Sequence, residues 1–313
     1  MKKINTIFIG IFISLIIAVI STSADEGKSS GLKSKLNSSK KNSISQEETC
    51  QLPDWLKRTS IAVDVASDEE PTYFLETIQP LLGTQHKDIV LFNQTRVSTK
   101  DARPTYNIGF GARKIFSDAY LLGGNVFYDY QDLHKHSRGG FGLEGISDRG
   151  LEARLNTYAA ISGEHLVKEN ANEFEYEEVA NGFDWELGSP LPYLNFLKVY
   201  GGGYWYNFQH FKNKYGWQMR TEYNPIKGSR VVFRMFDDTK RNKVGYGFEG
   251  ALSLKFTSFC PKDIISDIKG PKEAYPKVDL REKVLDRVVR DFDITVIKKT
   301  KSKGGLVIEG GKT

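Results

Sequence analysis

The feature that most constrains the fold of this chain is a regular alternation of side-chain type along its second half. Over 243–256 the even positions are apolar or glycine, and the odd positions are charged or small. The same period of two recurs over 151–161 and 215–223. Such alternation is typical of β-strands with one apolar and one polar face. Stretches of this kind, each closed by Gly, Pro, Asn or Asp, begin at Thr59 and predict an all-β domain.

Three details favour a closed transmembrane barrel over a soluble β-sandwich, whose strands would also alternate. Most stretches are about 8 to 14 residues long, nearer to a tilted membrane strand than to the usual strand of a globular protein. Tyr, Trp and Phe gather near the ends of the stretches, as the aromatic girdles of a membrane barrel require. The polar face mixes both signs of charge with glycine, as an inward face would.

We expect twelve strands, an even number, as a closed single-chain barrel of the bacterial outer-membrane type requires. The predicted fold class is therefore all-β, a closed antiparallel 12-stranded transmembrane β-barrel over 59–259. The longest predicted connection, 162–177, is acidic and would lie on the outer side. The predicted strands are 59–66, 71–79, 88–97, 103–115, 119–130, 138–147, 150–161, 178–188, 195–207, 214–223, 229–236 and 243–256.

The N-terminus has the pattern of a secretory signal peptide. A basic start precedes an apolar run over 4–20, and small residues at cleavage spacing end at Ala24. We expect 1–24 to be removed on export, and an uncleaved anchor helix is the alternative. Residues 25–58 are rich in Ser, Lys, Asn and Glu, which predicts a flexible periplasmic leader.

After the last predicted strand the alternation stops. Residues 279–290 carry apolar side chains at helical spacing, and 292–296 alternate again. We therefore expect a helix and an extended linker over 260–300, followed by a short tail over 301–313.

One long segment carries a specific resemblance. The sequence YNIGFGARKIFSDAYLLGGNVFYDYQDLHKHSRGGFGLEG over 106–145 resembles the central signature of the intimin/invasin family, the inverse autotransporters. It holds a Gly-x-Gly, an Asn-x-Phe-x-Asp and a Gly-x-Glu. Segments at 81–97, 180–187 and 222–226 resemble further parts of the family, in the same order.

The resemblance implies a twelve-stranded outer-membrane barrel with a periplasmic N-terminus. After its last strand the chain would turn back through the lumen as a helix and a linker, and 284–300 resembles that segment. Outer-membrane lipid and the barrel assembly machinery are the partners that the resemblance implies. Family members usually carry large adhesive modules after the linker, whereas 13 residues follow Thr300 in this sequence. We therefore expect a translocator and anchor that lacks a large adhesin passenger.

The charge distribution agrees with a tail inside the barrel. Residues 59–260 hold 22 Lys/Arg and 25 Asp/Glu, whereas 261–313 hold 13 and 9, so the two parts attract each other. A solvated periplasmic tail is the alternative. The residues expected to face the lumen are Glu144, Glu152, Arg154, Asp184, Glu186, Arg220, Glu222, Arg234 and Glu249, and those expected on the luminal helix are Arg281, Val284, Arg287 and Arg290.

Two other functions remain open at this point. Arginines including Arg113 and Arg230 would line an ion pathway in a small-solute pore, or pair with lumen carboxylates in a structural barrel. Alternatively the chain is a surface attachment protein that acts through outer loops such as 162–177 on an unidentified host or surface ligand.

The two cysteines lie outside the predicted strands. Cys50 precedes the first strand and Cys260 follows the last. These strands pair in a closed barrel, so the two thiols would meet and form a disulfide in an oxidising compartment. Two free thiols are the alternative.

Candidate chemistry is sparse. His134 and His136 lie near Asp129 and Asp132, and a His–Asp pair at a barrel rim would activate water. Solvated rim side chains are the favoured alternative, and Asp129 belongs to the family signature. No His-Glu-x-x-His, Gly-x-Ser-x-Gly or phosphate-loop pattern occurs. We expect a monomeric barrel with no enzyme activity, cofactor or metal, and the net charge of +5 is too modest to predict nucleic-acid binding.

Overall fold

The computed structural model describes most of the chain from Asp54 onward, within one compact unit that comprises Asp54–Phe256 and Cys260–Thr313. The predicted signal peptide, most of the predicted leader and both cysteines lie outside the described residues. The described ranges are 54–83, 89–100, 103–208, 211–224, 228–253, 273–302 and 307–309.

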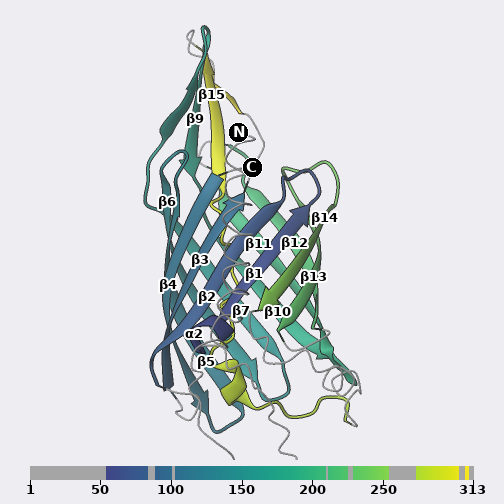
Figure 1. Ribbon diagram of the computed structural model, residues 1–313. Coiled ribbons are helices and arrows are strands. Elements are labelled where there is room, and N and C mark those ends of the chain that lie inside the picture. The colour runs from purple at the N-terminus through teal and green to yellow at the C-terminus, as the bar shows by residue number, and fades with distance from the viewer. Residues whose placement is uncertain are drawn as a thin grey trace, which may run out of the picture. The chain divides into compact units, whose positions relative to one another are not determined.

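Twelve antiparallel strands close into a barrel, which confirms the predicted fold class (Figure 1). Their order is β1-β14-β13-β12-β11-β10-β7-β6-β5-β4-β3-β2, so the last strand pairs with the first. The strands are β1 Thr59–Ala66, β2 Thr72–Leu82, β3 Ile89–Lys100, β4 Arg103–Phe116, β5 Tyr120–Gln131, β6 His136–Ser147, β7 Glu152–Ala160, β10 Asn181–Leu191, β11 Leu194–Asn207, β12 Lys214–Tyr223, β13 Ser229–Asp238 and β14 Gly245–Ser253.

The period of two sorts the side chains between the two surfaces of the barrel. On β4, Ile108 and Phe110 are 46% and 53% exposed, whereas Thr105 and Asn107 between such positions are almost fully buried. Successive side chains of a strand point to opposite faces. The outer face is therefore apolar and open, and the inner face is covered and carries most of the polar side chains.

The barrel begins with a short helix. Helix α2, Asp54–Lys57, immediately precedes β1. The backbone oxygen of Trp55 accepts hydrogen bonds from Thr59 Oγ1 at 3.1 Å and Gln79 Nε2 at 2.9 Å. The expectation of a flexible leader through residue 58 is therefore wrong for its last residues, because these hydrogen bonds fix them to β1 and β2.

A second, smaller sheet stands at the end of the barrel opposite α2 (Figure 1). Its order is β16-β15-β9-β8, and its strands are β8 His165–Glu169, β9 Glu173–Val179, β15 Val296–Ser302 and β16 Val307–Glu309. The hairpin β8–β9 occupies the connection that was predicted to be an irregular loop. The predicted strand 178–188 is wrong at its start, because Glu178 and Val179 pair with β15 and β10 begins at Asn181.

The predicted helix over 279–290 is present only as a single 3-10 turn, η1, at Leu280–Lys283. Beyond that turn the N–H of Asp286 still bonds the preceding turn, at the carbonyl of Lys283, 3.0 Å away, and the backbone that follows binds side chains of the barrel. Val288 donates its N–H to Gln94 Oε1 at 2.8 Å, and its carbonyl accepts from Gln94 Nε2 at 3.5 Å. Buried backbone groups need partners, and here β3 supplies them, so the segment has no need of helical hydrogen bonds.

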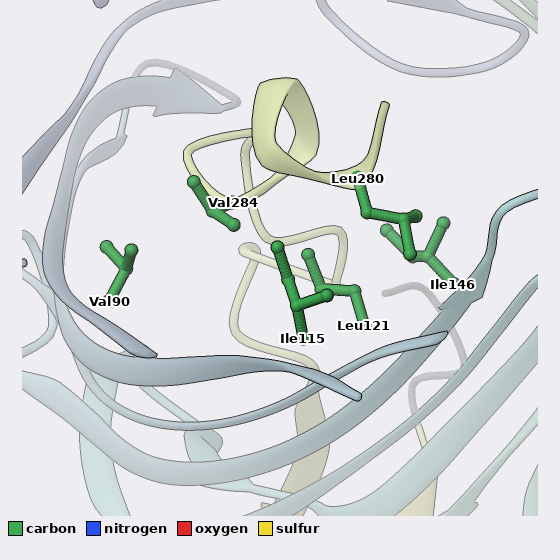
Figure 2. Packing of buried hydrophobic residues seen from close by; sticks show 6 residues of the cluster. All are labelled: Val90, Ile115, Leu121, Ile146, Leu280 and Val284. Carbon is green, nitrogen blue, oxygen red and sulfur yellow. The ribbon is translucent and has the colours of Figure 1, made fainter. Parts of the chain in front are cut away.

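Apolar side chains fix the start of this segment against the barrel wall (Figure 2). Leu280 and Val284 belong to one buried cluster with four inward-facing residues of β3, β4, β5 and β6, and Val284 is fully buried. Burial of side chains of this size contributes about 1.5–3 kcal/mol each. The four barrel residues are Val90, Ile115, Leu121 and Ile146.

Among the described residues, no helix has the length and apolar character needed to span a membrane.

Candidate functional site: the lumen and its threaded segment

Five of the nine residues predicted to face the lumen form a continuous chain of ion pairs on β7, β10 and β12. Glu152 pairs with Arg154, which donates to Glu186 at 2.9 Å. Arg220 then joins Glu186 at 2.7 Å and Glu222 at 2.8 Å. β7 and β10 are adjacent and place Arg154 opposite Glu186, whereas the side chain of Arg220 reaches Glu186 across the intervening strand β11. Each charge is thus matched by its neighbour, which offsets the cost of removing it from water.

Two further predicted residues pair with partners on other strands. Glu144 accepts from Arg113 Nε at 2.6 Å, and Glu249 accepts from Arg230 Nη2 at 2.8 Å. Arg113 and Arg230 therefore pair with lumen carboxylates, which was the alternative to their lining an ion pathway.

Arg234 and Asp184 complete the predicted lumen set. Arg234 binds Asp64 on β1 at 2.5 Å. Asp184 accepts hydrogen bonds from Asn156 at 2.8 Å and from Tyr158. All nine predicted residues are buried or half-buried, whereas the next residues along their strands are mostly exposed.

The four residues predicted on the luminal helix are placed differently from one another. Val284 packs in the core described above, and Arg287 lies 3.6 Å from Glu249. Arg290 binds Asp129 on β5. Arg281 pairs at 3.6 Å with Asp118, in the exposed turn between β4 and β5. Residues 280–292 therefore contact both ends and the middle of the barrel wall.

Several lumen residues bind the backbone of this segment, a role that the sequence analysis assigned to none of them. Arg113, fully buried, donates to the carbonyl oxygens of Val284, at 3.0 Å, and Asp286. Asn107 donates to the carbonyl of Phe292 at 3.0 Å. These contacts join residues more than 170 positions apart, so no local sequence pattern predicts them.

The family-like signature over 106–145 is the sequence feature that points to contacts with this segment. In its Asn-x-Phe-x-Asp part, Phe127 packs edge to face with Phe292 at 5.7 Å, and Asp129 binds Arg290. In its Gly-x-Gly part, a Cβ on Gly109 would lie 2.3 Å from the ring of Phe127. The glycine therefore provides the space in which Phe127 reaches residues 280–295, the segment before β15 that crosses the lumen and is called the threaded segment here.

A charged cavity of about 270 Å³ lies beside the threaded segment. It is lined by Asp64, Arg96 and Glu249 of the barrel and by Arg287 and Asp293 of the segment, among others. The segment packs apolar side chains against β2 to β6, and the cavity is lined mainly by charged side chains.

The rim beside β9 carries a histidine–carboxylate cluster. His134 Nδ1 and His136 Nε2 lie 2.7 and 3.0 Å from Glu177 Oε2, and Arg103 contacts both oxygens of Glu177 at 3.3 Å. Burial acts to raise the pKa of Glu177, but the hydrogen bonds from the two histidines and the charge of Arg103 hold that pKa at about 2.

This cluster corrects the expectation for the rim histidines. His136 is fully buried and is not solvated. Both histidines face Glu177, and neither forms the expected pair with Asp129 or Asp132, because Asp129 is occupied by Arg138 and Arg290.

Comparisons with known proteins agree with this architecture. The family model described as "Inverse autotransporter, beta-domain" matches residues 16–249, well over half of the chain. A solved structure described as "Unveiling the Mechanism Behind the in-meso Crystallization of Membrane Proteins" superposes with a TM-score of 0.61 at 22% identity, covering 77% of this chain and 99% of that one.

Three curated relatives share parts of the sequence. The "Putative attaching and effacing protein homolog" of Escherichia coli K12 is 33% identical over 119 residues, 38% of each chain. "Invasin" of Yersinia enterocolitica is 33% identical over 105 residues, 34% of this chain and 12% of that protein. "Inverse autotransporter adhesin YeeJ" of E. coli K12 is 29% identical over 152 residues, 47% of this chain and 6% of that protein.

The matched segments thus span well under two thirds of each of these relatives. The closed barrel, the apolar outer face and the family match together place the chain in the outer membrane of a Gram-negative bacterium. The chain belongs to the inverse autotransporter β-domain family.

Proposed function

We propose that the barrel is a non-enzymatic translocator and anchor, which holds residues 280–302 as the inner end of an exported chain. The α2 end of the barrel would face the periplasm, and the β8–β9 end would face the outside. The observation that carries this proposal is the course of the C-terminal segment. It enters beside Leu280, crosses the lumen past Asp129, and pairs as β15 with β9 at the opposite end.

The contacts along this course support a permanent hold. Arg113, Asn107 and Gln94 bind backbone groups, which every sequence presents, whereas Asp129 and Phe127 bind specific side chains. Any chain that passes through such a lumen meets the backbone contacts, but the side-chain contacts form only where its sequence matches. A segment that meets Asp129 with an arginine and Phe127 with a phenylalanine would stop there.

The sheet at the far end supports an anchoring role. β15 pairs with β9 over seven residue pairs, from Val296↔Val179 to Ser302↔Glu173. Strand addition of this kind satisfies the backbone of an emerging chain without dependence on its side chains. The hairpin β8–β9 would therefore be the first folded surface that an exported chain meets.

We further propose that the barrel works as a monomer and is inserted by the outer-membrane assembly machinery. Closure of β1 on β14 leaves no free edge in the barrel for a second copy to pair with. The surface attachment role suggested by the names of the relatives would belong to segments outside the barrel or to the β8–β9 hairpin.

An epitope tag placed after Thr313 tests the orientation and the course of the chain on intact bacteria. The tag should be cleaved by added protease. A tag in the β8–β9 turn is the external control, and a tag in the turn between Ser147 and Glu152, at the α2 end, is the protected control. Protection of the C-terminal tag while both controls behave as stated would contradict the proposal.

A further inference from the structure

We propose that His134, His136 and Glu177 form a binding site for a divalent transition-metal ion of the zinc class. The proposal is independent of the secretion role, because it concerns only the rim of the barrel. Imidazole nitrogens with one carboxylate oxygen are ligands that zinc takes in proteins.

The three ligand atoms already face one another. His134 Nδ1, His136 Nε2 and a carboxylate oxygen of Glu177 all lie within 4.8 Å of one another. Zinc bonds nitrogen and oxygen at about 2.0–2.2 Å, so tetrahedral ligand atoms lie roughly 3.3 Å apart. The His–Glu contacts of 2.7 and 3.0 Å would open by about half an ångström, and the widest separation, within 4.8 Å, would close toward roughly 3.3 Å to admit the ion.

The ligands come from separate elements that are each held in place. His134 lies in the turn after β5, His136 begins β6, and Glu177 lies in β9. His136 and Glu177 are at most 2% exposed, so their side chains have little freedom to lose when an ion binds. A site of this kind is largely preformed.

Two features around the ligands bear on the site, one in its favour and one that limits its strength. Arg103 contacts both oxygens of Glu177 at 3.3 Å, which orients the carboxylate as outer-shell partners orient metal ligands. On the other ring edge, His136 Nδ1 is buried and has no hydrogen-bond partner among the described residues. An ion on Nε2 would leave this ring nitrogen without the outer-shell acceptor that metal-bound histidines ordinarily have, which lowers the expected affinity.

The neighbouring positive charges lower the expected affinity of the site for zinc. Arg103 lies against the carboxylate, and Lys298 Nζ lies 4.0 Å from Glu177 Oε1. Both repel a dication, so the site should bind zinc more weakly than a closed structural site with four ligands. Removal of Lys298 takes away one of these charges and no ligand, so it should tighten binding.

A bound ion would join three elements at the rim. It would tie the β5–β6 turn and β6 to β9, and β9 carries β15. Zinc would therefore stiffen the sheet that holds the C-terminal segment.

Isothermal titration with zinc chloride tests the site on the full chain in detergent. Cys50→Ser and Cys260→Ser form the background, since free thiols also bind zinc. We expect one saturable zinc per chain, an affinity lower by on the order of a hundredfold in His134→Ala and in Glu177→Gln, and an affinity about twofold to fivefold higher in Lys298→Gln.

His165→Asn is the matched control. Its ring packs 5.4 Å from that of His136, but it is not one of the three ligands. This variant should keep one zinc per chain with nearly unchanged affinity. Heat-dependent mobility on gels should show every variant folded. Equal zinc affinity in folded His134→Ala, Glu177→Gln and the parent chain, or no saturable zinc in the parent, would overturn the proposal.

Discussion

Arg290 of the threaded segment binds Asp129 of β5 through both terminal nitrogens of its guanidinium, at 3.1 and 2.8 Å. Asp129 is fully buried and is also held by Arg138 of the neighbouring strand, at 2.8 Å. A buried carboxylate between two arginines ties one barrel wall to the chain that crosses the lumen. The same carboxylate belongs to the family-like signature, which gives that signature a physical role.

Arg290→Ala should loosen the threaded segment. Loss of one partner from a buried ion pair costs about 3–5 kcal/mol, and the low end applies here because Arg138 still holds Asp129. Amide hydrogen exchange over residues 286–294 should accelerate accordingly. Lys277→Ala is the control, because its pair with Asp148 at 3.5 Å is exposed and should change stability by less than about 0.5 kcal/mol. Equal exchange in both variants would contradict the role of Arg290.

Val284→Asp should open the lumen to ions. The substitution places a carboxylate among the side chains of Val90, Ile115 and Leu121, where it has no partner, at a cost of several kcal/mol. The start of the segment should then leave the wall, and planar-bilayer conductance should rise above that of the parent chain. Tyr275→Asp, at an exposed position before the lumen, should leave conductance unchanged. If the Val284→Asp variant had the same conductance as the parent chain, the segment would not be what closes the pore.

Cys50 and Cys260 should form one disulfide. Both lie outside the described residues, so the pairing stays a prediction from the closure of β1 on β14. Peptide mapping without reductant should recover a linked pair of peptides from protein exported to the outer membrane. Recovery of two free thiols would refute the bridge. The Cys50→Ser variant should still fold, because the ladders of the barrel carry its stability.

The contact between Glu164 and β15 should depend on pH. Burial acts to raise the pKa of Glu164, but hydrogen bonds from Lys299 and Lys301 hold it below the usual 4.5. Burial acts to lower the pKa of Lys299, but hydrogen bonds to Glu178 and Glu164 hold it above the usual 10.5. The contribution of Glu164 is therefore complete above about pH 4.5 and is lost as pH falls through its lowered pKa. The contribution of Lys299 is complete below about pH 10.5 and is lost as pH rises through its raised pKa.

Glu164→Gln measures this contact at each pH. The difference in β15 amide exchange between the parent and this variant should be largest near neutral pH. It should shrink in acid, because a protonated glutamate resembles glutamine. Lys168→Gln, whose ion pair with Glu175 is exposed, is the control for a general effect of charge. A difference that stays constant down to the acid limit would contradict the assignment.

The barrel itself could be predicted from the sequence because its cause is local. Each strand must alternate one lipid-facing and one lumen-facing residue, and this period is visible in any stretch of eight or more residues. The predicted ranges 59–66 and 214–223 coincide with β1 and β12, and the ends of the other strands lie within three residues of the prediction. The inward carboxylates followed from the same alternation.

The segment after the barrel could not be predicted in the same way, since its conformation depends on distant partners. The apolar spacing of 279–290 is helical, yet Gln94, Arg113 and Asn156 take the backbone hydrogen bonds that a helix would need. The β8–β9 hairpin likewise gains its partner β15 from a region more than 100 residues away. The alternation of residues by itself determined a twelve-stranded membrane barrel. Only the tertiary structure decided how the tail lies within it and which rim side chains meet, because those contacts join parts of the chain that no local pattern connects.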